Sequence, residues 1–236
     1  MKKMLAASLL LLSTLAYAQP AAGPYARMVV IQPKPGQGAA FEQGYQRHLE
    51  WHAKAGDSWT WYGWSFVLGD RLGMFMDGTF GHAAANFDAA VQPAGDAADN
   101  AANVVPYADF LSHGVFRRLD SASMGQSLPD TSPFLAMATY TVAAGDEVAF
   151  ERQLEAGASR PGAASSRTPS GAGRFTWYKL QIGGNAPQYV LMRAAASFGA
   201  AAELPEVLPP GARAMVRSVR TELLRYRAEM SYAPKN

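Results

Sequence analysis

The stretch from Ser58 to Gly81, SWTWYGWSFVLGDRLGMFMDGTFG, decides the fold, and a similar stretch, GRFTWYKLQIGGNAPQYVLMRAAASFG, recurs from Gly173 to Gly199. Each contains two runs rich in aromatic and aliphatic residues, separated by glycine and polar residues, which is typical of a β-hairpin. The triplet Thr-Trp-Tyr stands at 60–62 and again at 176–178, and both stretches end on Phe-Gly. The chain therefore contains an internal repeat.

The sequence around the two hairpins repeats as well. A strand is expected at 25–32 and at 134–141, each followed by a glycine turn and a helix. A second helix is expected to begin at each Phe-Gly, and a last strand to lie around 115–124 and 222–232. This order, β-α-β-β-α-β in each half, predicts an α+β fold of two tandem ferredoxin-like units. We place the first half at 19–124, a linker at 125–133 and the second half at 134–236.

The second strand of each half is apolar on both faces. Tyr62 and Trp64 alternate with Trp61, so neither face of the sheet is suited to water. We expect Tyr62 and Trp64 to face the helices, and Trp61 and Trp177 to lie between two sheets. The two halves are therefore expected to pack sheet to sheet, and the chain to be monomeric, with further association left open.

The element order, the duplicated Thr-Trp-Tyr strand and the repeated Phe-Gly resemble the dimeric α+β barrel superfamily over residues 25–232. That superfamily includes antibiotic-biosynthesis-type monooxygenases, NIPSNAP-like proteins and chlorite-dismutase-like heme proteins. The resemblance implies an intramolecular barrel in which two halves replace a homodimer. It also implies that a ligand pocket would lie between the helices and the sheet of one half. Heme is a cofactor that the resemblance allows, and no other is expected.

Residues 1–18 have the pattern of a signal peptide: Lys2 and Lys3, then an apolar run, then Ala-Tyr-Ala before Gln19. The apolar run is too short for a permanent membrane span. We therefore expect cleavage near Ala18 and a periplasmic or secreted protein with no membrane contact after cleavage. The chain has no cysteine, so disulfides are excluded. Loss of the two lysines lowers the 21 basic residues to 19, the number of acidic residues, so no nucleic-acid partner is expected.

All four histidines lie in the first half, and two of them share one face of the first predicted helix. His48 and His52 are one turn apart on the inward stripe with Phe41 and Tyr45. In the second half, an ungapped alignment puts Gly157 and Pro161 at the corresponding positions, so any site is expected in the first half alone. The candidate ligand-binding set is Tyr45, His48, His52, Tyr62, Trp64 and Met76.

Three interpretations of the two histidines stay open: structural core residues, contacts to a small apolar or aromatic ligand such as heme, and metal ligands. No third ligand stands at a recognisable spacing, so no metal ion is expected. Asp77 is expected between the sheets, where it would form an ion pair with Arg193 or transfer protons. The stretch 93–103 is expected to be a loop and then a helix, and 156–173 a loop.

The sequence has no catalytic motif, so the catalytic residues remain unknown and an enzymatic activity is left open. Three classes of function remain. The chain is a binding protein for a small apolar or aromatic molecule, an enzyme of the monooxygenase or heme-handling kind, or a non-catalytic interaction protein. Fold alone does not choose among them, because one fold hosts many functions.

Overall fold

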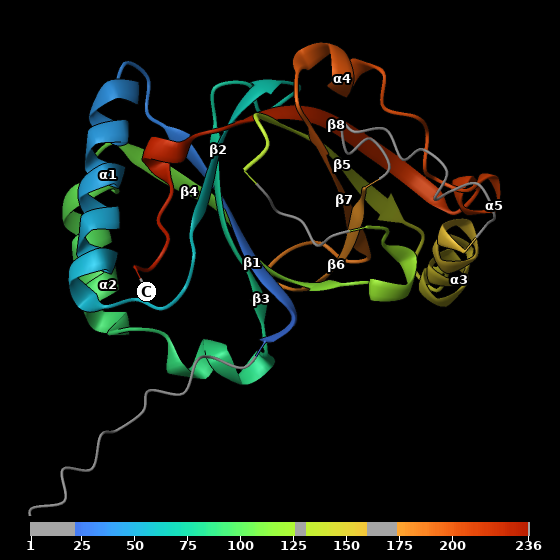
Figure 1. Cartoon of the computed structure of the whole chain (residues 1–236), viewed down its shortest axis with the longest axis horizontal. Helices are drawn as coiled ribbons and strands as arrows, with labels where there is room; N and C mark the ends of the chain where they lie inside the picture. The colour runs from blue at the N-terminus through green and yellow to red at the C-terminus, as the bar shows by residue number, and fades with distance from the viewer. Residues whose placement is uncertain (1–21, 126–130, 160–173, 236) are drawn as a thin grey trace, which may run out of the picture.

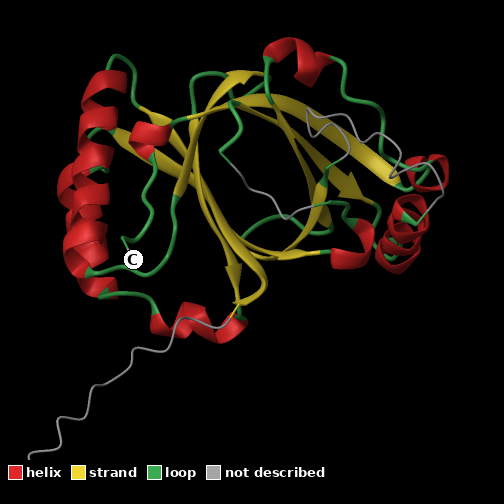
Figure 2. Cartoon of the chain, in the orientation of Figure 1, coloured by secondary structure: helices red, strands yellow, loops and turns green. Residues whose placement is uncertain are grey.

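A computed structural model describes residues 22–125, 131–159 and 174–235, and it contains a closed barrel of antiparallel strands flanked by helices (Figures 1 and 2). The strands are β1 Ala22–Pro33, β2 Tyr62–Leu68, β3 Phe75–His82, β4 Ala108–Arg118, β5 Phe134–Val142, β6 Thr176–Ile182, β7 Gln188–Ala195 and β8 Val216–Tyr226. The helices are α1 Gly38–Ala55, α2 Pro93–Asn103, α3 Glu147–Ala158, α4 Phe198–Ala202 and α5 Pro210–Arg213. Three 3₁₀ turns follow β3, β4 and β8: η1 Ala84–Ala89, η2 Asp120–Ala122 and η3 Ala228–Met230.

The strands follow the order β1-β3-β2-β8-β5-β7-β6-β4 around the barrel. β2 pairs with β8, and β4 pairs with β6, so the strands of the first half are joined to those of the second on both sides. An ion pair between Arg71, in the β2–β3 hairpin, and the buried Glu222 on β8 joins the same two halves. The expected α+β barrel is thus confirmed as an eight-stranded antiparallel barrel. Its closure leaves no exposed sheet edge.

The two faces of the second strand are the reverse of the expectation. Trp64, Phe66 and Tyr178 belong to the buried cluster in the barrel interior, to which both halves contribute. Trp61 packs in the separate cluster under α1, and Trp177 packs in the cluster under α3. The prediction that Trp61 and Trp177 lie between two sheets is therefore wrong. The alternation of side chains between the two faces was predicted correctly. A strand with aromatic residues buried on both faces, however, does not indicate which face meets a helix.

The sequence repeat and the structural repeat are out of register in this strand. Trp61 forms an isolated bridge to Tyr232, and the corresponding bridge in the second half joins Phe175 to Met124. Trp61 therefore corresponds in space to Phe175, whereas the Thr-Trp-Tyr triplet aligns it with Trp177. Because the displacement of two residues is one full period of a strand, matched side chains still point to the same face.

Several predicted boundaries differ from those of the structure. Phe80 and Gly81 belong to β3, so the expected helix start there is wrong, whereas α4 does begin at Phe198. The stretch 93–103 is helical throughout as α2, and β4 and β8 begin and end earlier than predicted. The signal peptide at 1–18, most of the predicted loop at 156–173 and part of the linker lie outside the described residues. No helix among the described residues is long and apolar enough to span a membrane.

Helices α1 and α2 lie against each other on one side of the barrel (Figure 1), and Gly44 allows their close approach. A Cβ atom at Gly44 would lie 1.9 Å from the backbone oxygen of Asn103, the last residue of α2. This contact matters for function, because α1 and α2 supply most of the polar side chains described below.

We expect Gly44→Ala to lower the free energy of unfolding by about 1–3 kcal/mol, because the added methyl group must push α2 away from α1. Urea unfolding measures the change. Gly38→Ala is the matched control, because a Cβ atom there meets nothing within 4 Å. Alanine is also the better helix former, so the control should be neutral or slightly stabilising. Equal stability of the two variants would contradict the close packing of α1 and α2.

Candidate functional site

A cavity of about 290 Å³ lies in the first half between α1, α2 and the strands beneath them. It is placed where the superfamily resemblance implies a ligand pocket, between the helices and the sheet. Polar and aromatic side chains share its wall. The lining residues are Arg27, Val29, Tyr45, His48, His52, Trp61, Asp77, Asp96, Ala97, Asn100, Phe110 and His113.

The C-terminus of α1 fixes the orientation of His52. Gly56 adopts a left-handed conformation (φ +70°), and the next amide, that of Asp57, donates to the carbonyl of His52 over 3.0 Å. This turn brings the Asp57 carboxylate back to the ring of His52, whose Nδ1 lies 2.8 Å from Oδ2. Asp57 also accepts hydrogen bonds from the Trp59 amide and from the indole of Trp61. Burial raises the pKa of Asp57, but these hydrogen bonds outweigh it and leave the pKa below its usual value.

Helix α2 fixes the orientation of His48 in the same way. Nδ1 of His48 lies 2.9 Å from Oδ1 of Asp99, and the Asn100 side-chain amide lies 2.9 Å from its Nε2. Burial lowers the pKa of His48, but the hydrogen bonds and charges of Asp96 and Asp99 outweigh it and raise the pKa above 6.5. Both histidines are buried, at 5% exposed for His48 and 4% for His52.

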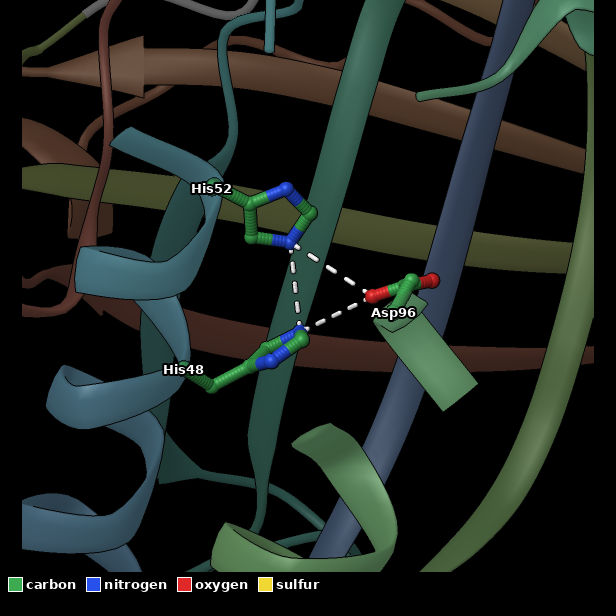
Figure 3. Close-up of side chains that lie close together, drawn as sticks. All are labelled: His48, His52 and Asp96. Atoms are coloured by element: carbon green, nitrogen blue, oxygen red, sulfur yellow. Dashed lines mark hydrogen bonds and ion pairs between the residues drawn. The ribbon is translucent and has the colours of Figure 1, made fainter. Parts of the chain in front are cut away.

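The inner nitrogens of the two histidines face each other and Asp96 (Figure 3). The Nε2 atoms of His48 and His52 are 3.2 Å apart. Oδ1 of Asp96 lies 3.3 Å from Nε2 of His48 and 3.8 Å from Nε2 of His52. Burial raises the pKa of Asp96, but its hydrogen bond to His48 and the charges around it outweigh this and lower the pKa. His48, His52 and Asp96 form the only group of three or more His, Cys, Asp or Glu side chains within the described ranges that could hold a metal ion.

Asp77 is the second polar feature of the cavity. Its Oδ2 accepts a hydrogen bond of 2.9 Å from the hydroxyl of Tyr45, and its buried Oδ1 has no hydrogen-bond partner within the part of the chain that the structure describes. Burial raises the pKa of Asp77 to about 6. Arg27 lies in the same wall, where its Nε donates to Nε2 of His113 and its guanidinium lies 5.4 Å from the Trp61 ring centre. Burial and the charge of Arg27 lower the pKa of His113 to about 4, in line with a neutral ring that accepts this bond.

The structure brings together half of the candidate ligand-binding set. Tyr45, His48 and His52 line the cavity, whereas Tyr62, Trp64 and Met76 lie on the opposite face of the sheet, in or against the barrel interior. The expectation that Tyr62 and Trp64 face the helices is therefore wrong, because the faces of β2 and β3 are reversed. Asp77 likewise faces α1 rather than the barrel interior, and it forms no ion pair with Arg193 among the described residues.

The sequence-based interpretation missed Asp96, Asp99 and Asn100. Their spacing places all three on one face of a helix, and this was the available signal. The stretch around them is rich in Ala, Asp and Asn, a composition equally typical of loops, so the sequence did not predict a helix face there. Asp96, Asp99 and Asn100 are far from His48 along the chain, and nothing in that separation indicated that they contact its ring.

The chain matches no protein-family model and no curated protein sequence. Solved structures do resemble it over most of its length. A monooxygenase-like protein from Lactobacillus acidophilus NCFM covers 90% of this chain and 97% of its own, with 11% identity and a TM-score of 0.56. An anthrone oxidase-like protein covers 90% and 94%, with 10% identity and a TM-score of 0.55. A mutant chlorite dismutase from Candidatus Nitrospira defluvii covers 89% and 93%, with 10% identity and a TM-score of 0.59.

These structures are monooxygenase-like and chlorite-dismutase-like proteins of the dimeric α+β barrel superfamily, so the expected resemblance is confirmed for the fold. Identities of 10–11% carry no assignment of activity to this chain.

Proposed function

We propose that the chain is a small-molecule enzyme of the monooxygenase-like kind, in which Asp77 removes a proton from a small aromatic substrate bound in the first-half cavity. The observation that carries the proposal is the environment of Asp77. Tyr45 holds one oxygen of this cavity-lining carboxylate, while the other is buried and has no hydrogen-bond partner among the described residues. A general base works best when its pKa is close to the working pH, and the pKa of about 6 meets that condition.

The rest of the wall suits the product of such a proton transfer. Removal of a proton leaves an electron-rich anion, which dioxygen then oxidises: one oxygen atom enters the product and the other leaves as water. The guanidinium of Arg27 lies in the same cavity to stabilise the anion. Trp61 and Phe110 supply aromatic surface for a planar ring. The substrate class is therefore a small aromatic molecule with one acidic C–H or O–H group. The charged side chains in the wall favour this class over the small apolar molecule that the sequence also allowed.

Heme is a poorer fit for this cavity. The volume of about 290 Å³ lies just below the range for small-molecule sites, roughly 300–1,000 Å³, and the charged side chains of Arg27, Asp77 and Asp96 stand in the wall. Under α3 in the second half, a cluster that includes Phe150 and Trp177 fills the space beneath the helix. Gly157, aligned with His48, packs so closely that an added Cβ would lie 2.5 Å from Pro209. The proposed proton transfer therefore uses the protein's own side chains.

Asp77→Asn tests the role of Asp77, because a buried catalytic carboxylate destabilises the protein that contains it. Folded Asp77 keeps its proton up to pH 6, while an unfolded aspartate loses it near pH 4, so wild-type stability falls as the pH rises through this window. The variant does not titrate, and at pH 8 it should be more stable than the wild type by about 2–3 kcal/mol, at 1.36 kcal/mol per pKa unit. Urea unfolding at pH 4 and pH 8 measures the difference.

The same variant should lose activity. Anthrone and 1-naphthol are suitable probes, with oxygen uptake as the measure of turnover and quenching of tryptophan fluorescence as the measure of binding. We expect Asp77→Asn to bind the probes and to lose turnover by a factor of about 10²–10⁴, the usual contribution of a positioned base. Asp88→Asn, exposed on η1, is the control and should change neither measurement. Wild-type turnover by Asp77→Asn would refute the role of Asp77.

We also propose that the protein acts outside the cytoplasm as a monomer made of two tandem ferredoxin-like halves. Export is supported by the signal-peptide pattern of residues 1–18, and the sequence of the mature N-terminus would test it. The two halves are supported by the repeated β-α-β-β order and by the equivalent strand orders β4-β1-β3-β2 and β8-β5-β7-β6. The expected partner is the small-molecule substrate alone, since equal numbers of acidic and basic residues in the mature chain do not favour a nucleic acid.

A further inference from the structure

We infer that His48, His52 and Asp96 form a binding site for one first-row divalent transition-metal ion in the wall of the first-half cavity. The site consists of two imidazole nitrogens and one carboxylate oxygen, all within 4.8 Å of one another. The inference goes beyond the proposed proton transfer and does not depend on it, because the evidence for it concerns a different set of side chains.

The three donor atoms are spaced as ligands of one ion. Their separations are 3.2, 3.3 and 3.8 Å. The point equidistant from three atoms so spaced lies about 2.0 Å from each, which matches the 2.0–2.2 Å bonds that zinc makes to histidine and carboxylate. The three ligand side chains therefore need almost no movement to bind an ion, and only the Asn100 amide, 2.9 Å from Nε2 of His48, has to turn away. Figure 3 shows His48 and His52 projecting from one helix and Asp96 reaching them from another.

The outer nitrogens of both histidines are already engaged with carboxylates. Nδ1 of His52 lies beside the Asp57 carboxylate. Both oxygens of this carboxylate accept hydrogen bonds from the N–H groups of Trp59 and Trp61, which can only donate. Nδ1 of His48 meets Asp99 in the same way. A carboxylate behind each imidazole is the usual arrangement around a metal-binding histidine, because it fixes the proton on the outer nitrogen.

It follows that both inner nitrogens carry lone pairs, and they lie close to each other and to Asp96. Nε2 of His48 accepts from the side-chain amide of Asn100, which also lies 3.1 Å from Oδ1 of Asp96. This amide already meets the lone pair of His48 and the carboxylate, so an ion bound there would replace it. The lone pair of Nε2 of His52 lies 3.2 Å from Nε2 of His48 and 3.8 Å from the Asp96 carboxylate, and negative groups so close repel each other unless something positive lies between them. A metal ion supplies that charge, and the alternative is a single proton shared by the two imidazoles.

The donor set indicates the class of ion. Two imidazoles and one carboxylate suit first-row ions such as Zn²⁺, Fe²⁺ or Mn²⁺, whereas Mg²⁺ and Ca²⁺ prefer oxygen donors alone. Three protein ligands leave at least one coordination position open, as in catalytic rather than structural metal sites. All three ligands line the cavity, so an ion held by them would be accessible to a bound substrate.

Metal content measures the inference directly and without a substrate. The full-length protein, without a histidine tag, is stripped with a chelator and dialysed against micromolar Zn²⁺, and the bound metal is counted by mass spectrometry. We expect one Zn²⁺ per chain. His48→Gln and Asp96→Asn should each bind Zn²⁺ at least 100-fold more weakly, while circular dichroism shows that the fold is retained. Asp99→Asn, which removes only the orienting carboxylate, should weaken binding by about 10–100-fold.

His113→Ala is the matched control, because His113 lines the same cavity outside the metal-binding group. It should bind Zn²⁺ as the wild type does, and so should Asp77→Asn. Binding lost equally in His113→Ala and His48→Gln would refute the assignment, as would a wild-type protein that retains no Zn²⁺. The second result would favour the shared proton. Neither result bears on Asp77, whose role is measured separately by stability and oxygen uptake.

Discussion

Asp57→Ala is expected to destabilise the protein by about 3–5 kcal/mol, the usual cost of removing one partner from a buried network of charged hydrogen bonds. The Asp57 carboxylate accepts from the ring of His52, the amide of Trp59 and the indole of Trp61, and all of these groups are buried. Alanine leaves each of them without its acceptor, and a buried unsatisfied donor costs about 1–3 kcal/mol. Urea unfolding at pH 7 gives the size of the loss.

Two further variants determine the origin of this effect. Asp88→Ala removes an exposed carboxylate on η1 and should change the free energy of unfolding by no more than about 0.5 kcal/mol. Asp57→Asn keeps one oxygen as an acceptor and should fall between Asp57→Ala and the wild type. A loss below about 1 kcal/mol for Asp57→Ala would mean that water replaces the carboxylate and that the turn after α1 does not hold His52.

The sequence predicted α1 well because one strong periodicity determines it. Phe41, Tyr45, His48 and His52 recur at helical spacing, and all four are buried in the structure. The same periodicity correctly placed both histidines toward the sheet. The prediction of an α+β barrel was confirmed for a related reason, since a sequence repeat indicates the order of helices and strands without any knowledge of their contacts.

The reversed faces of β2 show where periodicity fails. A strand with one polar face reveals its orientation, because the polar face meets water. Trp64 of β2 lies inside the barrel, whereas Trp61, the residue before β2, lies under α1. Both faces of the strand are therefore apolar and aromatic. The choice between the two orientations depends on which side chains fit beneath α1. That packing involves residues far apart in the sequence, such as Met230 near the C-terminus.

The candidate site was half predictable for a similar reason. His48 and His52 belong to one helix, so their common direction follows from local geometry. Asp96 and Asp99 approach them from α2, and the approach depends on the lack of a side chain at Gly44. Such a contact between two helices cannot be derived from the spacing within either helix. The third ligand of the inferred metal site therefore became visible only in the structure.

The fragment 19–125 is expected not to form a stable monomer. In the full chain, β2 pairs with β8 and β4 pairs with β6, so the fragment exposes two unpaired strand edges. It also exposes one side of the barrel interior, including Trp64, Phe66 and Phe116, which are at most 8% exposed in the full chain. An open edge beside an apolar face favours association with another sheet. Light scattering should therefore show a dimer, larger aggregates or precipitate.

The complementary fragment provides the control. Residues 131–236 carry β8 and β6, the partners that the first fragment lacks, so co-expression of the two should give a soluble one-to-one complex. The full chain already contains both sets of edges and should remain monomeric over the same concentration range. A fragment 19–125 that is soluble, monomeric and cooperatively folded would contradict this account of the barrel. In that case the apolar cluster shared by the two halves would be dispensable for folding, although its members from both halves are buried together.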